Sequence, residues 1–155
     1  MRYFSSSSVL FTLILLSAAT TVLSDDKGTA AAELAKLEGS WAFVSLESGG
    51  KPAPAESLKE MKSIRLTIKG STLTISRPGE AAREQTISID ATKNPQQIDI
   101  TRGNDKGTKR TALGIYKIEG KILKICTDDS GTERPTEFTS KEKHRAVSVV
   151  VLERQ

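Results

Sequence analysis

The sequence is poor in the residues that most often carry chemistry. It holds one cysteine, Cys126, and one histidine, His144, among 155 residues. A single cysteine excludes an intramolecular disulfide. One cysteine and one histidine together are too few ligands for a transition-metal site. A catalytic triad would have to use His144, which lies in a charged run without a nucleophile motif. We therefore expect no cofactor, no metal site and no catalytic residue.

Aromatic residues are also few, and the charge is nearly balanced. Beyond the N-terminal segment, the aromatic residues are Trp41, Phe43, Tyr116 and Phe138. The net charge is +4, and lysine and arginine mostly alternate with acidic residues instead of clustering. Because nucleic-acid binding requires a clustered basic surface, we expect no nucleic-acid partner.

The N-terminus has the pattern of a secretory signal peptide. Arg2 precedes an apolar stretch from Val9 to Ala19, and small residues at Val22 and Ser24 suit cleavage before Asp25. The stretch is shorter than the about 20 apolar residues that a membrane-spanning helix needs. We expect residues 1–24 to be a cleaved signal peptide and residues 25–33 a polar tether. Residues 34–155 then form one secreted or periplasmic domain, monomeric and without a membrane span.

The domain begins with a short helix predicted over Ala30–Glu38, after which apolar residues recur at every second position. A second short helix is predicted from Pro54 to Met61, because proline is tolerated in the first turn. Eight runs have the alternating pattern of strands: Trp41–Leu46, Ile64–Lys69, Thr72–Ser76, Gln85–Asp90, Gln97–Thr101, Thr111–Glu119, Ile122–Thr127 and Ala146–Leu152. Alternation with one polar face is typical of antiparallel strands, and closing the sheet removes its edges. We predict an all-β fold, an eight-stranded antiparallel up-and-down (lipocalin-like) barrel with a short N-terminal helix; a sandwich is the alternative.

Several blocks of sequence, in a fixed order, carry a resemblance to a known family. They are Leu37–Trp41, Gly50–Pro52, Asp90–Pro95, Ile98–Ile100, Leu113–Tyr116, Gly120, Leu123–Cys126 and Arg134–Phe138. Over about Leu34 to Leu152 the chain resembles a family of small, uncharacterised secreted domains that is abundant in planctomycete bacteria. The resemblance implies a lipocalin-like barrel in a secreted or periplasmic setting, and it implies no activity.

Gly39-Ser40-Trp41 is also similar to the Gly-x-Trp of the first lipocalin strand. In lipocalins this tryptophan closes one barrel end, and a basic side chain from near the C-terminus packs over it. A guanidinium stacked on an indole is favourable, and Arg154 or Arg145 can supply it. We predict structural roles for Gly39, Trp41 and Arg154, with an ordinary core position for Trp41 as the alternative.

A barrel of eight strands is just wide enough to be filled by its own side chains or to hold one small ligand. For an open cavity, the candidate ligand-binding residues are Phe43, Ile64, Leu66 and Tyr116, with Arg65 at the mouth. In the alternative, these side chains fill a solid core.

Three functions remain open at this point. The first is non-catalytic binding of a small apolar or amphipathic ligand. The second is interaction with an envelope protein through loops such as Gly103–Arg110 and Asp128–Arg134. The third is an unrecognised hydrolase that uses paired carboxylates.

Overall fold

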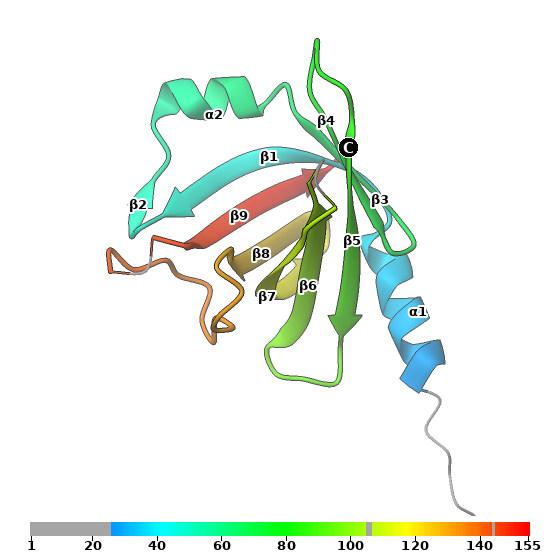
Figure 1. The fold of residues 1–155 in the computed structure, drawn as a ribbon. Helices are drawn as coiled ribbons and strands as arrows, with labels where there is room; N and C mark the ends of the chain where they lie inside the picture. The colour runs from blue at the N-terminus through cyan, green and yellow to red at the C-terminus, as the bar shows by residue number, and fades with distance from the viewer. Residues whose placement is uncertain (1–25, 105–106, 144) are drawn as a thin grey trace, which may run out of the picture.

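The structure is a computed structural model that describes residues 26–104, 107–143 and 145–155 (Figure 1). The predicted signal peptide and His144 lie outside the described residues. The elements are α1 (Asp26–Leu37), β1 (Gly39–Ser48), β2 (Lys51–Pro52), α2 (Ala55–Met61), β3 (Arg65–Lys69), β4 (Thr72–Ser76), β5 (Arg83–Asp90), β6 (Gln96–Gly103), β7 (Lys109–Glu119), β8 (Ile122–Asp128) and β9 (Val147–Arg154). Neither described helix has the length and apolar character needed to cross a membrane.

Eight strands of the described chain form a closed antiparallel barrel. From β3 to β9 each strand pairs with the next, and β1 closes the ring by pairing with both β3 and β9. The short β2 only extends the end of β1, where Ser48 pairs with Lys51. The prediction of an all-β, eight-stranded up-and-down barrel with a short N-terminal helix is confirmed.

The register of the strands decides which side chains enter the barrel. Leu66 pairs with Ile75 on the inner face of β3 and β4, whereas Arg65 pairs with Ser76 on the outer face. Successive side chains of a strand point to opposite faces, so the predicted alternation becomes a separation of core from surface. On β1 a bulge between Phe43 and Ser45 turns Val44 outward, where it is 45% exposed.

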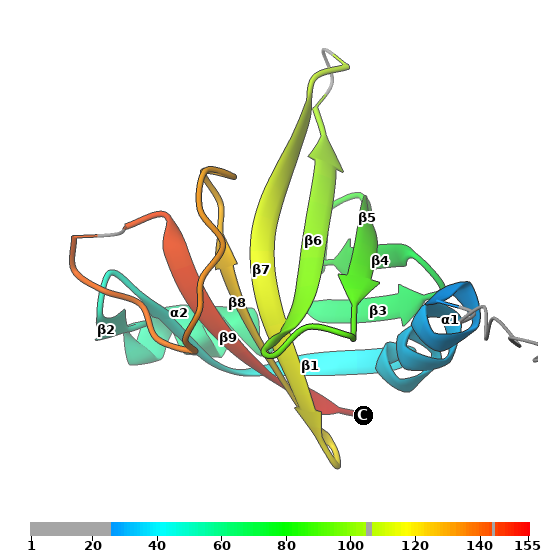
Figure 2. The ribbon, with the colours of Figure 1, turned by 90° about the horizontal axis from the view of Figure 1, so that it is seen from below.

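The two ends of the barrel differ in their connections. α1 lies at one end and α2 at the other, with β1 running between them (Figures 1 and 2). The turns at the α1 end, after β3, β5 and β7, have two to five residues (70–71, 91–95 and 120–121). At the α2 end lie residues 53–64, which include α2, residues 77–82 and the long β8–β9 connection, residues 129–146. The longer connections, which could border an opening to the interior, are therefore at the α2 end.

The helix α1 corrects one prediction. It begins at Asp26, so the segment predicted as a polar tether, residues 25–33, is helical from residue 26 onward. Three consecutive alanines, residues 30–32, have the highest helix propensity, and Leu34 and Leu37 pack against the barrel core. The polar composition at the start of this segment does not predict a helix. Packing of one apolar edge against the barrel stabilises it.

Candidate ligand-binding site

Trp41 and Arg154 close the α1 end of the barrel. Trp41 is fully buried, and the Arg154 guanidinium carbon lies 4.3 Å from the centroid of its ring. Trp41 Nε1 donates a hydrogen bond to the Leu37 carbonyl at 2.9 Å. Arg154 Nη2 donates to the Lys36 carbonyl at 2.6 Å, and Nη1 donates to the Glu38 carbonyl. Carbonyls at the end of a helix have no partner within the helix, so these donors fasten α1 to the barrel.

Gly39 makes room for this arrangement. Its φ is +126°, and a Cβ atom there would lie 2.7 Å from Arg154 Nη1. Both observations require glycine, because other residues rarely adopt this backbone conformation and a methyl group would displace the guanidinium. The predicted contact between Trp41 and Arg154 is confirmed, and Arg154 supplies the cation in place of Arg145.

Side chains fill the interior from α1 to the middle of the barrel. The fully buried ones include Leu37, Trp41, Ile87, Ile98, Tyr116, Leu123 and Leu152. Within the described chain the Tyr116 hydroxyl has no hydrogen-bond partner. Burial, with smaller contributions from the charges of Glu33 and Asp90, raises the pKa of Tyr116 to about 12. The phenol is therefore neutral, and its unpaired hydroxyl costs about 1–3 kcal/mol of stability.

Towards α2 the inner wall becomes polar. Phe43, Ile100 and Val150 are only partly buried against the core. Beyond them, Thr127 pairs with Ser148 on the inner face, and their hydroxyl oxygens lie 3.4 Å apart. The wall is thus apolar in its depth and hydrogen-bonding near its rim.

A recess of about 460 Å³ lies between α2 and the β4–β5 turn. Met61 and Ile64 supply apolar surface on the α2 side, and Arg77 and Glu80 line it from the turn. Small-molecule sites commonly have volumes of about 300–1,000 Å³. This recess is therefore large enough for a small ligand.

A second recess, of about 190 Å³, lies against the inner face of β4, β5 and β6. Ile75, Arg83 and Arg102 line it, together with the same Arg77 and Glu80. Three guanidinium groups and one carboxylate therefore line this recess.

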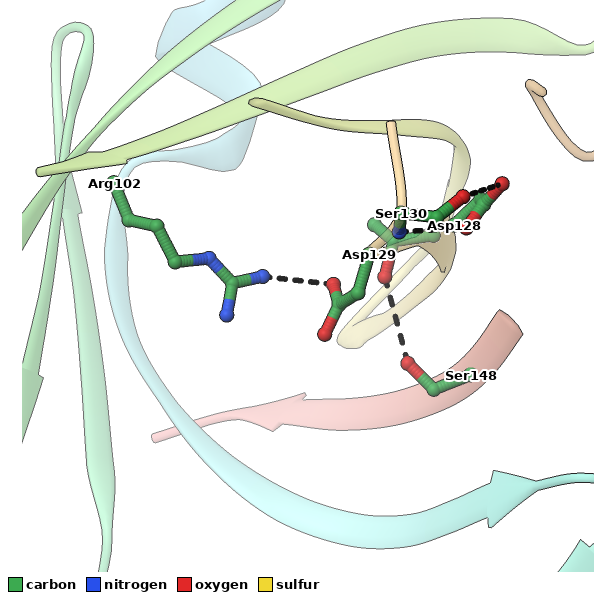
Figure 3. A network of polar contacts seen from close by, with 6 residues as sticks. Arg102, Asp128, Asp129, Ser130 and Ser148 are labelled. Atoms are coloured by element: carbon green, nitrogen blue, oxygen red, sulfur yellow. Dashed lines mark hydrogen bonds and ion pairs between the residues drawn. The ribbon is translucent and has the colours of Figure 1, made fainter. Parts of the chain in front are cut away.

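Arg102 reaches from β6 to the beginning of the β8–β9 connection (Figure 3). Its Nη2 lies 2.7 Å from Asp129 Oδ1, while its buried Nε has no hydrogen-bond partner in the described residues. Arg110 is directly opposite Arg102 on β7 and is exposed. Like charges placed opposite one another on neighbouring strands are destabilising. The α2 end therefore has an excess of positive charge on its inner rim.

The predicted ligand-binding residues divide into four groups. Ile64 lines the larger recess, whereas Phe43 is partly buried against the core and lines neither recess. Leu66 and Tyr116 are inward but buried within the packed core. Arg65 is on the outer face, where its Nη1 donates to the Lys62 carbonyl at 2.6 Å. Its assignment to the mouth is wrong because it adjoins the inward Leu66, and side chains alternate.

The arginines at the α2 end were missed by the sequence reasoning, although part of the signal was present. Ile98 and Ile100 face inward, so the same period of two places Arg102 inward as well. The predicted strand ended at Thr101, whereas β6 continues to Gly103. No sequence pattern indicated that the β4–β5 turn brings Arg77 to the same recess.

Residues 129–143, here called the outer segment, cross the outside of the barrel. Arg134 Nη2 lies 2.6 Å from Asp99 Oδ1, and its Nη1 donates to the Gly114 carbonyl at 2.6 Å. At the far side, Ser140 donates to Glu47 Oε1 through its N–H at 2.9 Å and its hydroxyl at 2.7 Å. These two hydrogen bonds lower the pKa of Glu47. The segment is therefore held at both edges of the surface that it covers.

Between these anchors the outer segment covers Cys126. Phe138 lies under the ammonium groups of Lys117 and Lys124, whose Nζ atoms are 5.8 and 5.7 Å from its ring centroid. Cys126 is fully buried, and burial raises the pKa of its thiol to about 11. A thiol that is packed in a strand and weakly ionised is unreactive.

Two other features of this region carry no ligand site. The hollow beneath the outer segment has a volume of about 130 Å³ and lies on the outside of the barrel, where it does not adjoin the recesses at the α2 end. The loop Asp128–Arg134 folds on itself, since Asp128 Oδ1 accepts from the Ser130 N–H at 2.8 Å and Oδ2 from its hydroxyl at 2.8 Å (Figure 3). Among the described side chains, no group of three or more His, Cys, Asp or Glu is placed to hold a metal ion.

Comparison with known proteins found no matching family model, no match among curated proteins and no match among solved structures. The resemblance to the secreted planctomycete family therefore stays a prediction.

Proposed function

We propose that the protein binds a small apolar or amphipathic molecule at the α2 end of its barrel, outside the cytoplasm and without catalysis. The observation that carries this proposal is the difference between the two ends. Trp41, Arg154 and α1 seal one end, whereas two recesses lie at the other. Export is supported by the sequence pattern of residues 1–24 alone.

The chemistry of the recesses supports an amphipathic ligand in particular. Met61, Ile64 and Ile75 offer apolar surface, while Arg77 and Glu80 lie at the boundary of both recesses. Ligand sites typically combine a mainly apolar lining with a few polar groups that fix orientation. The alternative of an interaction module receives less support, because Arg134 and Ser140 hold the outer segment against the barrel.

The proposal is tested with N-phenyl-1-naphthylamine, a neutral fluorophore that brightens in apolar surroundings. The protein is purified from the periplasm of an expression host, and N-terminal sequencing reports whether the signal is cleaved. We expect saturable binding with one site per chain. Met61→Gln lowers the affinity, because Met61 lines the larger recess, whereas Val44→Gln leaves it unchanged, because Val44 is exposed on the outside.

Two results would contradict the proposal. The first is the absence of saturable binding of the fluorophore by the folded, monodisperse protein. The second is an equal loss of affinity in Met61→Gln and Val44→Gln, which would place the bound fluorophore outside the recess.

A further inference from the structure

The inner rim of the α2 end carries more guanidinium groups than carboxylates. Four arginines from three separate segments, Arg77, Arg83, Arg102 and Arg110, lie on this rim or line its recesses. Their acidic neighbours are Glu80 and Asp129. Glu60, which lines the larger recess, is a third carboxylate, so four positive groups and three negative ones leave an excess of one positive charge.

The ion pairs at this rim leave much of the guanidinium surface unused. Glu80 Oε1 lies 3.8 Å from Arg77 Nη1, and Glu80 Oε2 lies 3.5 Å from Arg83 Nη2. Both distances are longer than those of well-formed charge-assisted hydrogen bonds. Arg83 keeps 72% of its side-chain surface exposed. Arg110 has no ion pair within the described chain, and it lies opposite Arg102. Such a rim lowers the energy of an anion that binds there.

Arg102 combines charge with unused hydrogen-bonding capacity. Only Nη2 is paired, at 2.7 Å from Asp129, while the buried Nε has no partner in the described residues. A guanidinium presents its donors as a planar fork that matches the two oxygens of an oxyanion. Arg102 lines the smaller recess and keeps 41% of its side chain exposed, so the part of the guanidinium that is not bonded to Asp129 can donate to a ligand there.

We infer that the molecule bound at the α2 end is an amphiphile with an anionic oxygen head group, held by Arg102 and Arg83 in the smaller recess. The apolar part lies against Ile75 and the partly buried inner wall at Ile100. This inference rests on the proposed function and specifies its ligand class. Arg102 and Arg83 act as the residues that determine specificity.

Asp129 has a distinct part in this arrangement. Its carboxylate occupies Arg102 Nη2 and competes with the head group for the same cation. Removal of the Arg102 side chain and removal of the Asp129 charge both abolish the ion pair. They are expected to change the affinity for an anion in opposite directions.

The first test compares decanoate, 1-decanol, acetate and inorganic phosphate as competitors of N-phenyl-1-naphthylamine. We expect decanoate to bind about tenfold more tightly than decanol, since one hydrogen bond to a charged group gives about that factor. Acetate and phosphate bind weakly, because they lack the apolar part. Phosphate that competes as well as decanoate would overturn the inference, since the site would then take a free anion.

The second test uses charge variants of the full chain. Arg102→Gln weakens decanoate binding about tenfold and leaves decanol binding unchanged, and Arg83→Gln acts in the same direction. Asp129→Asn strengthens decanoate binding. Arg65→Gln is the matched control, because it removes one positive charge from the outer face of the barrel. A purely structural role of the Arg102–Asp129 pair would weaken binding in both of its variants.

Failure of the inference and failure of the proposed function are distinguishable. Equal affinities for decanoate and decanol, with no effect of Arg102→Gln, overturn the anionic head group and leave ligand binding intact. No competition by any compound, together with no binding of the fluorophore, overturns both.

Discussion

The Arg154 guanidinium stacks on the Trp41 indole, 4.3 Å from the ring centroid, and both side chains also hydrogen-bond the last carbonyls of α1. One contact thus joins the first strand, the last strand and the N-terminal helix. Because it closes the ring of strands and seals one end, we propose the α2 end as the place where a ligand enters.

Arg154→Ala is expected to lower the free energy of unfolding by about 2–3 kcal/mol, through loss of one cation–π contact and two hydrogen bonds. Arg154→Lys restores part of this loss, because lysine keeps the charge without the planar fork. Urea denaturation followed by Trp41 fluorescence measures both. Lys69→Ala, an exposed position on the outer face of β3, is the control. An Arg154→Ala variant as stable as this control would contradict the role of the contact.

Gly39→Ala is expected to cost about 1–3 kcal/mol, since alanine is strained at a φ of +126°. Its methyl group would also lie 2.7 Å from Arg154 Nη1. Part of the cost therefore disappears in an Arg154→Ala background, and a double-mutant cycle measures this coupling. Additive effects of the two substitutions would show that the guanidinium does not restrict position 39.

Tyr116→Phe is expected to stabilise the protein by about 1 kcal/mol, because it removes a buried hydroxyl that has no partner in the described chain. The ring and its packing stay. Tyr116→Leu is the comparison variant, and it lowers stability through loss of buried volume. A clear loss of stability in Tyr116→Phe, measured by chemical denaturation, would mean that the hydroxyl has a bonding partner in solution.

Glu47 is expected to give the barrel a stability that depends on acid pH. Hydrogen bonds from Ser140 lower its folded pKa below the ordinary value of 4.5, so its ionised form is favoured in the folded state. The contribution is complete well above pH 4.5 and is lost as the pH falls through the lower folded value. Wild type is thus more stable than Glu47→Gln at pH 7, and the difference shrinks below pH 4.5. A difference that does not change with pH would refute this account.

Cys126 is expected to react slowly with thiol reagents in the native protein. Burial raises its pKa to about 11, so little thiolate is present near pH 8. Phe138→Ala loosens the outer segment above the thiol and increases the labelling rate by 5,5′-dithiobis(2-nitrobenzoate). Val44→Ala, on the exposed side of β1, leaves the rate unchanged. Fast labelling of the wild-type protein would show that the outer segment does not cover Cys126 in solution.

The strand pattern was predictable because a period of two is a local property. The alternation of Ile64, Leu66 and Ile68 with polar residues indicates which side of the strand faces the core, without reference to any distant residue. The same holds for Leu73 and Ile75. The stacking of Arg154 on Trp41 followed from the lipocalin resemblance of three residues. The helical start of α1 at Asp26 did not follow, because contacts of Leu34 and Leu37 with the barrel stabilise that helix.

The candidate site was less predictable, for a related reason. The prediction puts Arg65 at the mouth of a cavity, yet alternation next to the inward Leu66 turns it outward. Arg102 and Arg110 lie inward by the same rule, once the true length of β6 and β7 is known.

The sequence by itself predicted the strands and the turns between them, and its single cysteine excluded an intramolecular disulfide. It also has the pattern of an N-terminal export signal. Each of these depends on residue type or on spacing within a few positions. Only the tertiary structure decided which end is sealed, where Cys126 is covered, and that arginines from β4–β5, β6 and β7 meet at one rim. Those arrangements depend on register and closure between segments far apart in the chain, and these are set by packing of the whole barrel.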